Sequence, residues 1–187
     1  MPETPDQETL ALLQRRDARG FELAYRHYAE RIFGFLVRLS GSRSLAEDLL
    51  QHTFMRLAEA GPRLRVDSDL RAWLFTVARN AFHSQARSRR AALRVDVELG
   101  VMPRASGTSP DEGLALAELE RALGRLSALD RELLLLFGVE GLNHAELATI
   151  LAIDPVTVRK RISRARARLA EALDEGARVV SKSGVRT

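Results

Sequence analysis

The chain has 187 residues, which is enough for one domain or two small ones. Hydrophobic residues make up 45% and charged residues 29%, so the chain can bury a core and global disorder is not expected. The absence of cysteine excludes disulfides, thiolate catalysis and cysteine-based zinc sites. No apolar run reaches the length of a membrane-spanning helix, and the first ten residues are acidic and polar, so we expect a cytoplasmic protein without membrane insertion.

Positive charge is gathered in two separate blocks. The formal net charge is only +4, but 27 of the 29 basic residues are arginine. Residues 62–94 carry a net charge of +6, residues 155–170 carry another +6, and the connector 95–120 carries −5. Because arginine makes bidentate contacts with phosphate and guanine, the two blocks indicate two contacts with one polyanion. Solvated helix faces, or the arginine bias of a GC-rich genome, would give the same composition.

The first elements are predicted as helices. Residues 6–17 have the pattern of a short leading helix. Apolar residues from Phe21 to Leu39 recur at three- and four-residue spacing, which predicts an amphipathic helix that Gly41 ends. Ser44 and Glu47 have the spacing of a capping box, which would open a second helix.

A loop and a third helix follow the breakers at residues 61–62. The apolar positions between Leu70 and Ala81 predict a helix whose inner stripe includes Trp73. Its outward stripe consists of Asn80, His83, Arg87 and Arg90. A basic helix with nearby aromatic residues suits single-stranded DNA, although Trp73 is better explained as a core residue.

The remainder divides into a linker, a second helical module and a tail. Gly and Pro between residues 92 and 108 indicate a linker, and Ser109-Pro110-Asp111-Glu112 has the pattern of a helix start. Ser127 and Asp130 are predicted to cap the next helix. No strand pattern competes with the helical ones. We therefore expect domains over 1–92 and 109–175, joined by a linker at 93–108 and followed by a tail at 176–187.

Residues 143–169 have the pattern of a helix-turn-helix. Asn143 and Glu146 have the spacing of a capping box, and Asp154 and Pro155 are suited to start the second helix. Ala152, in the turn between them, is workable without glycine if the backbone there keeps a negative φ. The second helix has an apolar inner face and a basic outer face, which is the form of a recognition helix in a major groove.

Position along this helix predicts the role of each basic residue. Side chains near its start reach base edges, and those farther along meet phosphates. The predicted base-reading residues are Arg159, Lys160, Ser163 and Arg164, and the predicted phosphate contacts are Arg166 and Arg168. A basic helix for a membrane surface or an acidic partner is the alternative, which the two-helix context disfavours.

Three segments together resemble one family. They are AEDLLQHTFMRL (46–57), RAWLFTVARNAF (71–82) and GLNHAELATILAIDPVTVRKRISRARARL (141–169). In this order and spacing they resemble RNA polymerase sigma factors of the extracytoplasmic-function (ECF) group. The resemblance implies an all-α fold of two small helical domains, region two and region four, joined by a flexible linker.

The resemblance also implies a role for particular residues. Asp48, Gln51 and, farther along, Arg56 fall where the family docks on the clamp of the polymerase β′ subunit, with capping and solvation as the alternative. The loop Leu64, Arg65, Val66, Asp67, Ser68 and Asp69 corresponds to the one that captures an extruded −10 base. Asn80 matches a position beside that base, and His83 and Arg87 follow the strand. Arg159, Lys160, Ser163, Arg164 and Arg166 fall on the −35-reading helix.

Two positions depart from the family pattern. Ala152 and Val156 stand where the family often has glycine, which affects the promoter sequence that is read more than the fold.

The resulting hypothesis is a transcription initiation factor. Its implied partners are core RNA polymerase through the β and β′ subunits, promoter DNA and an anti-sigma factor. The alternative is a helix-turn-helix regulator with an N-terminal sensing or dimerisation domain, which would leave the AEDLLQ segment and the basic third helix unexplained. An enzyme is not supported, since the histidines at 27, 52, 83 and 144 are isolated and no phosphate-cradling motif occurs. We expect no catalytic residue, no metal and no cofactor.

Overall fold

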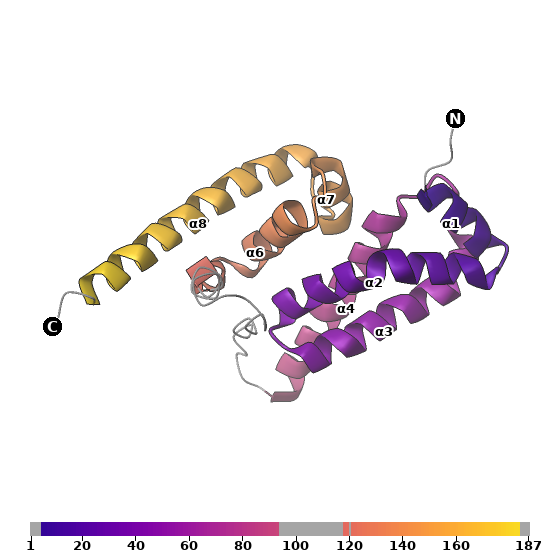
Figure 1. Cartoon of the computed structure of the whole chain (residues 1–187), viewed down its shortest axis with the longest axis horizontal. Coiled ribbons are helices and arrows are strands. Elements are labelled where there is room, and N and C mark those ends of the chain that lie inside the picture. The colour runs from indigo at the N-terminus through magenta and orange to yellow at the C-terminus, as the bar shows by residue number, and fades with distance from the viewer. Residues whose placement is uncertain (1–4, 94–117, 120, 184–187) are drawn as a thin grey trace.

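A computed structural model describes residues 5–93, 118–119 and 121–183. Within these ranges the regular structure is entirely helical, in agreement with the predicted all-α fold (Figure 1). The N-terminal module is residues 5–93 and the C-terminal module is residues 118–183. The expected linker and the helix start at Ser109 lie outside the described residues, apart from residue 93.

The N-terminal module is a bundle of four helices. They are α1 (Pro5–Gln14), α2 (Ala18–Ser40), α3 (Arg43–Ala60) and α4 (Leu70–Leu93), with a 3-10 turn η1 (Gly61–Arg63) after α3. The predicted stripe of α2 is buried from Ala24 to Leu39, and Phe21 at its start is half-buried. Gly41 ends this helix with a φ of 67°, a backbone conformation that glycine adopts without strain. Trp73 is half-buried and packs against the core, as the inner stripe of α4 predicts.

The predicted start of α3 is wrong by two residues. Ser42, and not Ser44, is the N-cap, because its backbone is extended and its hydroxyl accepts a hydrogen bond from the Leu45 amide. Ser44 lies inside the first turn, so Glu47 is not part of a capping box and pairs with Arg43 instead. Both serines have a side chain suited to an N-cap, and Ser42 is the one that directly precedes the first residue of the helix.

The C-terminal module contains the predicted helix-turn-helix. After α6 (Ala128–Leu134), a π-helical turn η2 (Leu135–Val139) leads to α7 (His144–Leu151) and α8 (Pro155–Ser183). The predicted capping box is present, because the Asn143 side chain accepts from the Glu146 amide and the Glu146 carboxylate accepts from the Asn143 amide. At the start of α8 the Asp154 carboxylate accepts from the Thr157 amide. The Ser127 hydroxyl accepts from the Asp130 amide at the start of α6.

The negative φ under which a non-glycine turn is workable does not occur at Ala152. This residue ends α7 in the left-handed region with a φ of 54°, and its amide donates to carbonyls of the last turn of α7. A left-handed non-glycine residue is strained by roughly 1 kcal/mol or more. The turn geometry of the helix-turn-helix is therefore kept with alanine in the position that glycine suits best.

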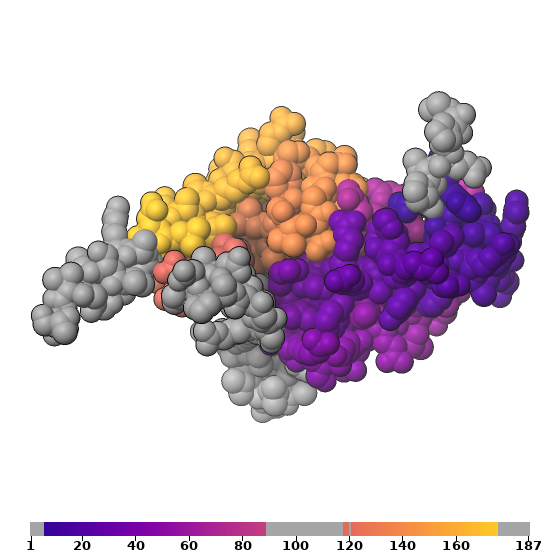
Figure 2. Space-filling view, viewed as in Figure 1, coloured from indigo at the N-terminus to yellow at the C-terminus, as the bar shows by residue number. Residues whose placement is uncertain are grey.

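The two modules are in direct contact. One apolar cluster contains Phe35 and Phe75 of the N-terminal module together with Leu133, Leu136 and Leu147 of the C-terminal module. Helices α4 and α7 lie against each other, and the space-filling view shows the orange surface of α7 beside the purple surface of the N-terminal module (Figure 2). Within the described residues, none of the helices is long and apolar enough to cross a membrane.

Two glycines of α2 provide a test of this packing. A Cβ at Gly20 would lie 2.7 Å from the Leu13 amide nitrogen, whereas a Cβ at Gly34 would meet only the end of the Arg38 side chain at 3.0 Å. We expect Gly20→Ala to lower the free energy of unfolding by about 1–3 kcal/mol, because α1 would have to move. Gly34→Ala should be neutral or stabilise by up to about 1 kcal/mol. Urea unfolding of both variants measures the difference, and equal effects would contradict the close α1–α2 contact.

Candidate nucleic-acid interface

The outer face of α8 is an exposed basic surface. Arg159, Lys160, Ser163 and Arg164 are all exposed, and no ion pair to any of them occurs within the described residues. The inner face of the same helix buries Val158, Ile162 and Ala165 against the module. The structure therefore presents the four predicted base-reading side chains together on one side of a helix, without a competing carboxylate.

The two predicted phosphate contacts differ from these four. The Arg166 guanidinium lies over the Phe137 ring, 4.8 Å from its centroid, and the same ring contacts His144. Arg168 donates from Nη1 to the Asp130 carboxylate at 2.6 Å. Asp130 is buried, so this bond ties α8 to α6. Arg168 thus links two helices of the module, and both Arg166 and Arg168 stay exposed.

The loop between η1 and α4 is held by its own polar groups. Arg65 and Asp67 form a bidentate pair, with Nε–Oδ1 and Nη2–Oδ2 distances of 2.8 and 2.7 Å, and this hydrogen bonding holds the pKa of Asp67 below its ordinary value. The Asp69 carboxylate accepts from the Ala72 amide and so caps α4. Gln14 of α1 donates to the Leu64 carbonyl oxygen.

A cavity of about 500 Å³ lies behind this loop. Its walls include Val66, Asp67, Ser68 and Asp69 of the loop and Tyr28 and Arg31 of α2. Burial raises the pKa of Tyr28 well above its ordinary value, and the phenol donates to Asp6. Glu146 of the C-terminal module forms part of the same wall and is ion-paired with Arg71. The predicted base-capture loop therefore borders a cavity that the other module partly closes.

The predicted outward stripe of α4 contains both exposed residues and a residue that contacts the other module. Asn80 and Arg87 are exposed. His83 is half-buried, and its Nε2 lies 3.3 Å from a carboxylate oxygen of Glu132 in α6. Nε of Arg79 lies 2.6 Å from Oε1 of the same Glu132 carboxylate and forms an ion pair with it. The Nε–H bond does not point at this oxygen, so the contact is not a hydrogen bond. Arg71 and Arg79 are not among the predicted site residues, because nothing in the local sequence distinguishes them from the other arginines of the basic block.

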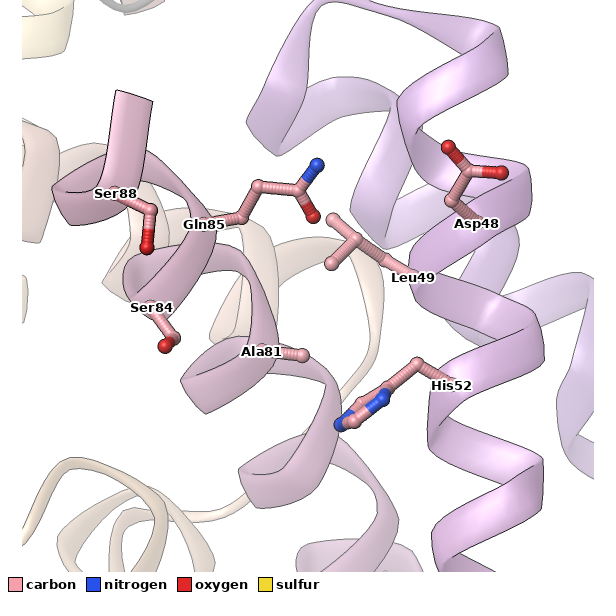
Figure 3. Close-up of a pocket in the computed structure, with 7 residues that line it drawn as sticks. All are labelled: Asp48, Leu49, His52, Ala81, Ser84, Gln85 and Ser88. Carbon is pink, nitrogen blue, oxygen red and sulfur yellow. The ribbon is translucent and has the colours of Figure 1, made fainter. Parts of the chain in front are cut away.

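The outer face of α3 carries the predicted polymerase-docking residues. Asp48, Gln51 and Arg56 are all exposed on this helix, and Arg56 is paired with Glu59 at 2.6 Å. A groove of about 600 Å³ separates α3 from α4 and is lined by Asp48, Leu49, His52, Ala81, Ser84, Gln85 and Ser88 (Figure 3). Figure 3 shows Asp48 and His52 on one wall and the α4 residues on the other. No cluster of three or more metal-ligating side chains occurs in the part of the chain that the structure describes.

Family models match both modules. The model of sigma-70 region 2 matches residues 24–92, and the model of sigma-70 region 4 matches residues 116–169. The chain is 33% identical to the ECF RNA polymerase sigma factor EcfG of Rhodopseudomonas palustris over 141 residues, 74% of this chain and 77% of that protein. It is 31% identical to the RNA polymerase sigma-H factor of Pseudomonas aeruginosa over 180 residues, 90% of this chain and 93% of that protein.

The fold of this chain is also similar to that of sigma factors whose structures have been solved. The sigma factor RpoE of Bartonella quintana, in complex with the anti-sigma factor NepR, superposes with a TM-score of 0.71 at 32% identity, covering 82% of this chain and 96% of RpoE. CnrH in complex with the cytosolic domain of CnrY also superposes with a TM-score of 0.71, at 25% identity, covering 92% of this chain and 99% of CnrH.

The contact between Phe137 and Arg166 can be tested on its own. Phe137→Leu keeps an apolar side chain in the core but removes the ring, so a cation–π contribution of about 0.5–1 kcal/mol is lost. We expect the full chain to bind a labelled 20-base-pair duplex of random sequence more weakly at low salt, because the Arg166 guanidinium is no longer held in one direction before it meets a phosphate. In an Arg166→Gln background the same change should have no further effect. Additive losses in fluorescence anisotropy would contradict the assignment of Phe137 as a support for Arg166.

Proposed function

Since the chain belongs to the sigma-70 family of RNA polymerase sigma factors, in the ECF group, we propose that its two modules divide promoter recognition between them. It is a bacterial transcription initiation factor, and its partners are core RNA polymerase and promoter DNA. In our proposal the C-terminal module reads duplex −35 DNA, and the N-terminal module docks on the polymerase and holds the melted −10 strand.

The observation that carries this division is the contrast between the two basic surfaces. The base-reading face of α8 is an exposed helix surface without an ion-paired carboxylate, which suits the major groove of a duplex. The α4 surface lies beside a loop and a cavity of about 500 Å³, which suits an unstacked base. Holding that base would offset an unpairing cost of a few kcal/mol. Asn80 stands exposed between the loop and Arg87, at the position expected beside the base.

We assign region two to residues 1–92 and region four to residues 109–175, with 93–108 as a linker and 176–187 as a tail. The matches of the two family models, at 24–92 and 116–169, lie within the two proposed domains and so support these limits. Helix α8 continues to Ser183, so the proposed tail begins within a helix. We assign no chemical step to the chain, because the polymerase makes the RNA, and we place its work in the cytoplasm.

An anti-sigma factor is the third proposed partner. The solved structures of RpoE and CnrH hold a sigma factor together with NepR and CnrY, respectively. Superposition of this chain on both supports a similar inhibitory partner for it.

Run-off transcription with purified core polymerase and a library of genomic fragments tests the function. We expect the chain to select a defined set of start sites, from which a −35 sequence can be derived. On such a template Arg164→Ala should lose about 1–3 kcal/mol of −35 discrimination and so reduce transcription, with polymerase binding retained. Arg15→Ala, an exposed arginine at the end of α1, is the matched control. An unchanged −35 preference would remove Arg164 from the base-reading residues.

Polymerase docking is tested through α3. Asp48→Ala combined with Gln51→Ala should weaken capture of core polymerase, because both side chains are exposed on the proposed docking face and neither supports the core. Circular dichroism should show the helical content unchanged. Glu30→Ala, an exposed glutamate of α2, controls for the loss of one negative charge. Capture equal to that of the Glu30 variant would exclude Asp48 and Gln51 from the interface.

A further inference from the structure

The start of helix α8 exposes a large apolar side chain. Helix α8 runs along the outer side of the C-terminal module, away from α2 and α3 (Figure 1). Val156 is the second residue of this helix and is 58% exposed, whereas Ile153 in the preceding turn is half-buried against the core. A single exposed valine is ordinary on most protein surfaces, but this one lies within a basic face.

Val156 lies on the middle line of the outward face of α8. Residues four and seven positions apart share one side of a helix, and here they are Lys160 and Ser163, which are both exposed. The buried stripe of the helix lies on the opposite side and consists of Val158, Ile162 and Ala165. Val156 therefore continues the line of predicted base-reading residues to the first turn of the helix.

Arginines flank this middle line on both sides. At about 100° per residue, Arg159 lies to one side of the line and Arg164 to the other. Their long side chains can reach base edges or the phosphates beyond, whereas the short side chain of Val156 touches only what lies directly against the helix. The first residues of a recognition helix are the ones that approach base edges in the major groove.

The start of α8 is poorly suited to a phosphate. The Asp154 carboxylate accepts a hydrogen bond from the Thr157 amide at 2.9 Å, and this bonding holds the pKa of Asp154 below its ordinary value. A phosphate at this place would meet a negative charge and would find that amide already bonded. The helix start therefore favours an uncharged partner over a phosphate.

Valine is suited to a contact of fixed direction. Branching at Cβ leaves valine one strongly preferred rotamer in a helix, so its two methyl groups point in a set direction before a partner binds. Little side-chain entropy is then lost when the contact forms. On the major-groove edges of the four unmodified bases, the apolar group is the C5 methyl of thymine.

We propose that Val156 selects a thymine of the −35 duplex by packing its methyl groups against the C5 methyl of that base. This inference rests on the proposed function, because it takes α8 as the helix that enters the major groove. It adds an apolar contact to the polar ones that Lys160 and Ser163 are expected to make. Either side of the contact can be removed separately, by taking the methyl group from the base or from the protein.

The base side is tested with deoxyuridine, which differs from thymidine only in lacking the C5 methyl group. Run-off transcription with core polymerase and the full chain first identifies a promoter and its −35 sequence. Each thymine of that sequence, on either strand, is then replaced in turn, and competition with a labelled promoter measures binding by the complete polymerase. One replacement should weaken binding about fourfold, as expected for the loss of one buried methyl group.

The protein side is tested with Val156→Ala, which should weaken binding to the thymine promoter by a similar factor. Deoxyuridine at the sensitive position should then have no further effect. Circular dichroism should be unchanged, because Val156 is exposed and alanine suits a helix better than valine. Val139→Ala is the matched control, since Val139 is 53% exposed but lies in η2, outside α8. This control should retain the full deoxyuridine effect.

The outcomes separate the thymine contact from the proposed function. The contact alone would be overturned by a −35 sequence without thymine, or by deoxyuridine that has no effect at any position. It would also be overturned if Val156→Ala lost the same affinity with either base, or if Val139→Ala abolished the deoxyuridine effect as well. A chain that selects no start site would overturn both the proposed function and the contact.

Discussion

The buried carboxylate of Glu132 is the contact on which the arrangement of the two modules depends. A charge with 1% of its side chain exposed is costly unless it is paired, and both of its partners, Arg79 and His83, come from the other module. Burial also raises the pKa of Glu140, which Arg31 partly counteracts. The apolar cluster shared by the modules supplies contact area without direction, so these ion pairs set how the modules are oriented.

Arginines that look alike in composition have different roles in the folded chain. Arg71 and Arg79 bind carboxylates of the other module, and Arg168 binds the buried Asp130 of its own. Arg159 and Arg164 have no such partner in the part of the chain that the structure describes. An arginine that is already neutralised has to exchange its carboxylate for a phosphate before it can bind DNA, so the free arginines of α8 are the ones ready to do so.

Helix starts were predicted correctly from the sequence where only one residue is suited to cap the helix. The capping box at Asn143 was predicted and confirmed, because cap, helix and turn all lie within four residues. The start of α3 was wrong because Ser42 and Ser44 are both good caps, and only the backbone of the preceding turn distinguishes them. Ala152 takes a left-handed φ of 54°, which could not be read from its residue type, because alanine rarely adopts this conformation. The roles of individual DNA and polymerase contacts stay predictions.

The sequence by itself determined the helical class, most helix limits, the helix-turn-helix and the family, because these depend on periodicity and caps within a few residues and on motifs in a set order. Only the tertiary structure decided which charges are used inside the molecule. The partners in those contacts are 75 residues apart for Arg71 and Glu146 and 109 apart for Arg31 and Glu140. Pattern reading covers a helical turn or two, whereas an ion pair between modules depends on how whole helices pack, and that is a property of the folded chain.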